Sequence, residues 1–217
     1  GSSQMAKGWY YLGPSGKAEK NDWKKLGDVR YSFDSQGRMR TGWHYENGDI
    51  YYLGDENQGY TQSGWRYLES DGRKRPAEGS VSKALVPGEP GGQWYYFNSS
   101  GKARRAEVGS YKESEIDGHR YYFDANGVMA TGWREMDGAW YYFQENGKCV
   151  VNAWAQIQDN WYLFGTDGKM MTGWAKVDQD YFYLNTDGRM LIGWLSDSEG
   201  SKYYMDMTNG KMSVGWK

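Results

Sequence analysis

Aromatic rings at a regular interval are the residues of this sequence best suited to chemistry. The segment from Asp137 to Trp174 twice places a cluster of aromatic residues, then a turn containing glycine, then a lone tryptophan. In the cluster "WYYF" at 140–143, an extended backbone points the first and third side chains one way and the second and fourth the other way. One set of rings can therefore build a core while the other set lines a groove.

The interval recurs along the chain. Aromatic residues make up 18% of the sequence, with 12 Trp and 20 Tyr, beside 31 Gly. A period near 20 residues predicts a linear array of small units, none of which closes a core alone. Weaker copies such as "WYYLGPSGKAEKNDW", which ends at Trp23, bring the expected number of units to about ten. The regular tryptophans, 20 to 22 residues apart, are Trp133, Trp154, Trp174, Trp194 and Trp216.

Each unit is predicted to form a β-hairpin. The cluster "WYYF" favours a strand, "QENG" or "GTDG" supplies the residues that a turn with positive φ needs, and a segment such as "KMMTGW" resumes extended backbone. No window combines helical spacing with caps, so we expect an all-β solenoid of hairpins. The chain divides into divergent repeats at 1–72, an irregular segment with one repeat and long loops at 73–119, and regular repeats at 120–217. The irregular segment holds three of the 4 prolines.

The residue types that usually carry catalysis are sparse and scattered. His44 and His119 lie far apart in sequence, and Cys149 is the only cysteine, which excludes an internal disulfide and a cysteine-based zinc site. The Asp-Gly pairs recur with the repeat and lack the alternating ligands of a calcium loop, so they are turn residues. We therefore expect no enzyme activity, no metal and no cofactor.

Charge and hydropathy exclude further classes of partner. The formal net charge is −2, so no global positive field favours nucleic acid, although stacked aromatic rings can bind single strands. No stretch approaches the ~20 apolar residues of a membrane-spanning helix. We expect neither nucleic-acid binding nor membrane insertion.

The order of motifs within a unit resembles a known family. A GW pair, a "WYYF" cluster, a glycine turn and a segment such as "GKMMTGW" are similar to the cell-wall-binding repeats, which include the choline-binding and glucan-binding repeats of Gram-positive surface proteins. The resemblance is strongest from Arg120 to Lys217. It implies a left-handed superhelix of hairpins that is non-catalytic, extracellular and associated with the cell wall, with possible self-association through the repeats.

The resemblance also implies where a ligand would lie. In choline-binding members, grooves between consecutive hairpins hold the quaternary ammonium in a box of aromatic rings, often with a methionine alongside, and each desolvated cation–π contact contributes roughly 0.5 to 2 kcal/mol. The box would use the GW tryptophan, the first aromatic residue of the following cluster and an aromatic residue one unit further on. The expected ligand-binding residues are Trp133, Trp140, Trp154, Trp161, Trp174 and Tyr181, with Met170 and Met190 as neighbours.

Some units depart from this pattern, and the ligand stays open. Arg30, Ile50, Arg120 and Lys202 stand where other clusters begin with an aromatic residue. A guanidinium or ammonium group there would repel choline, and it could stack on the rings or donate hydrogen bonds to sugar hydroxyls. The first hypothesis is a module that binds choline on teichoic acid. The alternatives are a module that binds a glycan polymer, such as glucan or a host glycan, and a structural or adhesion spacer.

Overall fold

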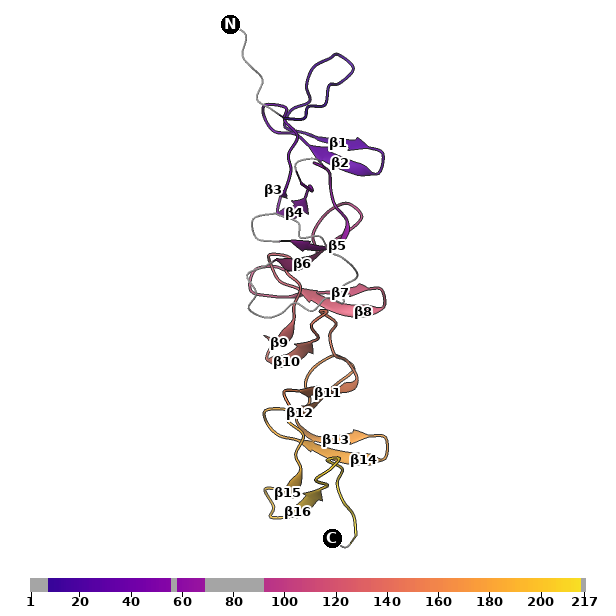
Figure 1. Ribbon diagram of the computed structural model, residues 1–217. Coiled ribbons are helices and arrows are strands. Elements are labelled where there is room, and N and C mark those ends of the chain that lie inside the picture. The colour runs from indigo at the N-terminus through magenta and orange to yellow at the C-terminus, as the bar shows by residue number, and fades with distance from the viewer. Residues whose placement is uncertain (1–7, 56–57, 69–91, 216–217) are drawn as a thin grey trace. The chain divides into compact units, whose positions relative to one another are not determined.

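The computed structural model describes residues 8–55, 58–68 and 92–215, and the regular structure of this part consists of strands only (Figure 1). The strands pair with their sequence neighbours into separate two-stranded sheets. The all-β hairpin prediction is therefore confirmed, while the number of units stays a prediction. The pairs are β1 (Trp23–Leu26) with β2 (Val29–Ser32), β3 (Trp43–Glu46) with β4 (Asp49–Tyr52), β5 (Gly64–Leu68) with β6 (Gln93–Phe97), β7 (Lys112–Ile116) with β8 (His119–Phe123), β9 (Gly132–Met136) with β10 (Ala139–Phe143), β11 (Ala153–Ile157) with β12 (Asn160–Phe164), β13 (Gly173–Val177) with β14 (Asp180–Leu184), and β15 (Gly193–Ser196) with β16 (Lys202–Met205).

The two strands of each hairpin differ from the pair that the sequence indicated. We expected the cluster to pair with the segment that follows it, but β10 pairs with the preceding strand β9 in the register Trp140↔Glu135. The turn between them is Asp137-Gly138, with φ of 52° and 73°. Left-handed backbone at both central residues matches the twist of a two-residue hairpin. The turn after the cluster closes only an isolated bridge, Phe143↔Cys149.

Alternation along the clusters builds the core. In β10, Tyr141 and Phe143 are buried, whereas Trp140 is 42% exposed. The second and fourth rings therefore pack inside, as the strand pattern predicted. Most of the fourth cluster residues are among the most completely buried side chains: Leu53, Phe97, Phe123, Phe143, Phe164, Leu184 and Met205.

Backbone hydrogen bonds join each hairpin to the next at the interval of the repeat. The amide of Met170 donates to the carbonyl of Trp140 at 2.7 Å, and the amide of Met190 donates to the carbonyl of Trp161 at 2.8 Å. This bond brings the methionine of one unit beside the first cluster residue of the unit before it.

The chain forms two compact units. Unit 1 comprises residues 1–116 and 121–130, and unit 2 comprises residues 117–120 and 131–217. In unit 1, β5 and β6 pair through Leu68↔Gln93, so one hairpin joins strands separated by a long connection. The expected irregular segment lies partly outside the described residues, from 73 to 91, and its remainder holds β6 and β7. No helix of the described chain is long and apolar enough to cross a membrane.

Candidate functional site

Four side chains meet repeatedly where one hairpin follows another, and we call this arrangement an aromatic step. A step contains the tryptophan of the first strand of a hairpin and the first cluster residue of its second strand. The next unit adds its second cluster residue and a methionine, whose backbone amide donates to the carbonyl of the first cluster residue. Each step is named after its tryptophan.

The Trp133 step shows the arrangement clearly. The Trp133 ring centroid lies 4.9 Å from that of Tyr162 at an interplanar angle of 68°, and 6.2 Å from that of Trp140 at 82°. Met170 is held beside Trp140 by its backbone hydrogen bond. Edge-to-face contacts of this kind hold the rings in fixed orientations. Because Trp140 remains partly exposed, part of this aromatic surface faces solvent.

The Trp154 step lines a half-open cavity of about 350 Å³. Trp154 lies 4.9 Å from Phe182 at 64°, and Trp161 is 41% exposed. The volume is at the lower end of the range for small-molecule pockets. Apart from two polar side chains, the walls are ring faces and a thioether. The lining residues are Trp154, Trp161, Phe182, Met190, Thr208 and Asn209.

The Trp174 step repeats the geometry with one added charge. Trp174 lies 4.9 Å from Tyr203 at 73°, and the amide of Met212 donates to the carbonyl of Tyr181 at 2.7 Å. The Lys176 ammonium lies 5.4 Å from the centroid of the Tyr181 ring. A cation of the chain itself therefore already contacts this ring.

The structure brings together most of the predicted residues and shows which ring is the third one of each step. The sequence offered Trp161 for the Trp133 step and Tyr181 for the Trp154 step without deciding which aromatic residue supplies this ring, and the contacting rings are Tyr162 and Phe182. Trp161 and Tyr181 instead belong to the steps of their own hairpins. Met170 and Met190 were expected beside the Trp174–Tyr181 pair, but their amides bond to the carbonyls of Trp140 and Trp161, so they belong to the Trp133 and Trp154 steps. Sequence reasoning missed Tyr203 and Met212, although they occupy the same repeat positions as Tyr162 and Met170.

The residue across the hairpin from the first cluster residue changes the charge of each step. Glu135 pairs with Trp140, Gln156 with Trp161, and Lys176 with Tyr181. We call this the cross-strand position. The three partly exposed steps therefore carry a negative, a neutral and a positive side chain in turn.

A second charged group adjoins the Trp133 step. A hydrogen bond with the Tyr162 hydroxyl raises the pKa of Arg189, and Asp187 raises it further. The Arg189 side chain lies 3.3 Å from the Asp187 carboxylate. This carboxylate offsets the guanidinium charge, whereas Glu135 adds a negative charge at the cross-strand position of this step.

In unit 1, the Trp65 step has the same ring geometry but is closed. Trp65 lies 4.8 Å from Tyr121 at 62° and 6.5 Å from Trp94 at 82°. The cross-strand position holds Tyr67, whose ring lies 5.3 Å from that of Trp94. Trp94 is only 5% exposed, and Met129 is buried as well. A ring in place of Glu135 thus converts a partly open groove into core.

The Trp43 step is also filled. Ile50 takes the place of the first aromatic cluster residue and is buried, and Tyr95 packs 4.8 Å from Trp43. Burial raises the pKa of Tyr95 to about 12, as expected for a hydroxyl in an apolar environment. This step is part of the core.

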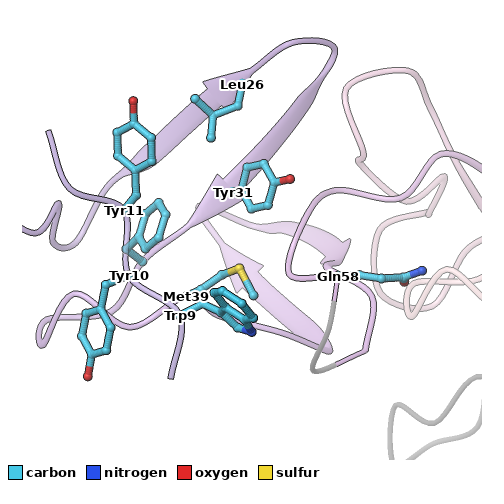
Figure 2. Close-up of a pocket in the computed structure, with 8 residues that line it drawn as sticks. Trp9, Tyr10, Tyr11, Leu26, Tyr31, Met39 and Gln58 are labelled. Carbon is cyan, nitrogen blue, oxygen red and sulfur yellow. The ribbon is translucent and has the colours of Figure 1, made fainter. Parts of the chain in front are cut away.

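A further pocket lies near the beginning of the described chain (Figure 2). It has a volume of about 310 Å³. The amide of Met39 donates to the carbonyl of Trp9 at 2.8 Å, so these residues correspond to Met170 and Trp140. Trp9 is 67% exposed. Sequence reasoning did not include this pocket, although the segment "GRMRTGW" gave the position of its methionine. The lining residues are Trp9, Tyr10, Tyr11, Leu26, Tyr31, Phe33, Met39 and Gln58.

The polar residues considered for catalysis lie apart from the steps in unit 2. His44 packs against Trp23, and His119 lies 2.8 Å from the Lys148 ammonium. Cys149 is buried. Within residues 8–55, 58–68 and 92–215, no three His, Cys, Asp or Glu side chains gather as metal ligands.

Comparison with known families agrees with the repeated geometry. The choline-binding repeat model matches residues 112–154 and 171–215, and the cell wall binding repeat model matches residues 91–103 and 152–170. The chain belongs to the cell-wall-binding repeat family. The repeat unit that forms its hairpins is therefore shared with this family.

Solved structures and one curated protein show the range of relatives. Choline binding protein F from Streptococcus pneumoniae, determined in the presence of a peptidoglycan analogue, is 27% identical, with a TM-score of 0.70 over 100% of this chain and 73% of that chain. The protein CbpJ from Streptococcus pneumoniae is 26% identical, with a TM-score of 0.63 over 90% of this chain and 74% of that chain. Glucosyltransferase-S from Streptococcus mutans is 30% identical over 147 residues, which are 65% of this chain and 10% of that protein. The chain thus spans about a tenth of the length of the glucosyltransferase.

Proposed function

We propose that the chain is a non-catalytic module that attaches a protein to the bacterial surface by binding the choline groups of teichoic acid. The cavity of the Trp154 step carries this proposal. It is lined by Trp154, Trp161, Phe182 and Met190. A quaternary ammonium cannot donate hydrogen bonds, so ring faces and a thioether are the environment that suits it.

The three steps of unit 2 would act together. Each contact of a cation with a ring contributes roughly 0.5 to 2 kcal/mol, so three rings support millimolar binding, which corresponds to about 4 kcal/mol. Teichoic acid repeats the choline group along a polymer. Occupying several steps at once would then raise the overall affinity by roughly 10² to 10⁴. We infer that the module acts outside the cell, in contact with the wall.

A glycan ligand is the second candidate. The relationship to Glucosyltransferase-S favours it, and so do Thr208 and Asn209, which add a hydroxyl and an amide to the wall of the Trp154 cavity. Sugar hydroxyls could exchange hydrogen bonds with these groups while an apolar sugar face stacks on a ring. In this case neutral oligosaccharides, and not choline, would occupy the groove.

The test is a titration of the chain labelled with 5-fluorotryptophan, followed by fluorine NMR, with choline and separately with dextran oligosaccharides. The choline proposal expects the Trp154 resonance to shift and saturate at millimolar choline. Replacing Trp161 by Ala should abolish that shift. The matched control is Trp194→Ala, because Trp194 is 67% exposed and no following hairpin of the described chain adds a ring to it. A Trp154 resonance that shifts with dextran oligosaccharides and not with choline would support the glycan candidate. A resonance that shifts with neither ligand would support the structural or adhesion spacer.

A further inference from the structure

The Trp23 step has the ring spacing of the partly exposed steps but a different first cluster residue. Trp23 lies 4.9 Å from Tyr51 at 51°, the same centroid distance as between Trp133 and Tyr162. The amide of Thr61 donates to the carbonyl of Arg30 at 2.8 Å. This bond corresponds to the one between Met170 and Trp140 in unit 2, so Arg30 occupies the position that an aromatic residue occupies there.

The guanidinium of Arg30 lies on the face of the tryptophan. Its central carbon is 4.4 Å from the Trp23 ring centroid, well within the ~6 Å limit of a cation–π contact. The amide of Arg30 donates to the Thr61 hydroxyl at 3.2 Å. Both backbone groups of Arg30 are therefore bonded, which fixes the base of the side chain over the ring.

The tryptophan is held in place as well. Its indole Nε1–H donates to the Glu46 carboxylate, and the His44 ring packs 5.3 Å from it at 62°. An indole that is bonded at its edge and packed on its side cannot turn its occupied face away. The cross-strand position of this step holds Lys25, which pairs with Arg30, so a second positive charge of the chain adjoins the guanidinium.

We propose that Arg30 is a built-in cationic occupant of the Trp23 step, and that it excludes external quaternary ammonium groups from a site that the surrounding rings would otherwise form. This inference rests on the proposed function for the chemical class of the excluded ligand. The side chain is tethered to the step, so the effective concentration of its guanidinium is in the millimolar range or above. This concentration is at least as high as the millimolar dissociation constant proposed for choline, so the guanidinium can compete with choline for the ring. An arriving cation would also meet the like charge of the guanidinium. Arg30 thus determines whether the Trp23 step accepts a ligand.

Lys176 provides an instructive contrast in unit 2. Its ammonium lies 5.4 Å from the Tyr181 centroid, but it comes from the cross-strand position and the step keeps an aromatic first cluster residue. Tyr181 remains partly exposed. A lysine at the cross-strand position therefore weakens ligand binding at its step. An arginine at the first cluster position instead takes the place of the aromatic ring found there in other steps, and its guanidinium covers the tryptophan ring.

The experiment compares Arg30→Met with Arg30→Lys in the chain labelled with 5-fluorotryptophan. Methionine keeps most of the apolar stem and removes the charge, while lysine keeps a cation of similar reach. The Trp23 resonance is assigned by its loss in Trp23→Phe, and Trp154 serves as the reporter of the proposed function. With choline, we expect Trp23 to be silent in the native chain and in Arg30→Lys. In Arg30→Met it should shift saturably, about tenfold more weakly than Trp154, since two rings bind less than three.

Each outcome decides between the possibilities. A Trp23 resonance that shifts in the native chain as Trp154 does, or that stays silent in Arg30→Met while Trp154 responds, overturns the role of Arg30 and leaves the proposed function intact. A silent Trp154 in every variant contradicts the proposed function. In that case the Trp23 resonance still tests the role of Arg30. A saturable Trp23 shift that occurs only in Arg30→Met supports Arg30 as the occupant of the step, and the absence of this shift refutes that role. The variant Arg30→Trp, which restores a third ring, should bring the Trp23 midpoint to within about threefold of that of Trp154.

Discussion

Removing the ammonium of Lys176 is expected to strengthen choline binding at the Trp174 step. This ammonium lies 5.4 Å from the centroid of the Tyr181 ring, so a ligand on the same ring would approach it to about 7 Å. At an exposed site with the dielectric constant of water, two unit charges at that distance repel by about 0.6 kcal/mol. A lysine–ring contact at an exposed site contributes about 0.5 kcal/mol, and a ligand that shares the ring would weaken it. Together these effects amount to about 1 kcal/mol, or about fivefold in affinity.

The assay measures the choline midpoint of the Trp174 fluorine resonance in the native chain and in Lys176→Met. The midpoint should fall about fivefold, and it should fall less at high salt because part of the effect is a screened repulsion. Lys112→Met is the control, since Lys112 is exposed at the beginning of β7 and its removal changes the net charge equally. An unchanged or higher midpoint in Lys176→Met, or the same decrease in Lys112→Met, would refute the view that this ammonium competes for the ring.

Replacing Tyr67 by Gln should open the Trp65 step. It should destabilise unit 1 by about 2 kcal/mol through lost packing, shift Trp94 emission to the red and allow choline to quench it; a buried Trp94 in the variant would contradict the covering role of Tyr67. Burial, with a contribution from Arg40, lowers the pKa of His44. The unfolded chain therefore takes up a proton near pH 6.5 more readily than the folded chain, and the melting temperature should fall as the pH is lowered below about 6.5. His44→Gln should melt with less pH dependence, and equal slopes would exclude His44 as the cause. Asp159 has a φ of 65°, so Asp159→Gly should stabilise the β11–β12 hairpin by about 0.5 kcal/mol, seen as a higher melting temperature; a decrease would show that the aspartate side chain contributes more than the backbone strain.

The repeat and its alternating faces are local properties, so they could be predicted from the sequence. A cluster such as "WYYF" has one buried and one exposed face, because successive side chains of a strand point in opposite directions. Phe143 at the fourth position is buried and Trp140 at the first is partly exposed, as this alternation requires. The interval between tryptophans likewise predicted that each unit depends on its neighbours.

The partners of each ring depend on tertiary structure. The cluster could pair with the strand before it or with the segment after it, and both connections contain turn residues. The pair Asp137-Gly138 favours the preceding strand because both residues adopt left-handed backbone. This register then decides that Tyr162, and not Trp161, contacts Trp133.

The state of each step is decided by side chains that no single repeat contains. A tryptophan in a GW pair packs in the same way in the Trp65 and Trp133 steps, yet Tyr67 covers the first and Glu135 leaves the second partly open. The sequence alone determined that rings recur at fixed positions and that Arg30 would place a charge among them. Only the folded hairpins decided that this charge covers the face of the Trp23 ring. The reason is that each ring contacts its cross-strand neighbour and the next unit, and the residues of the next unit, about 20 positions further along the sequence, meet it only when the hairpins stack.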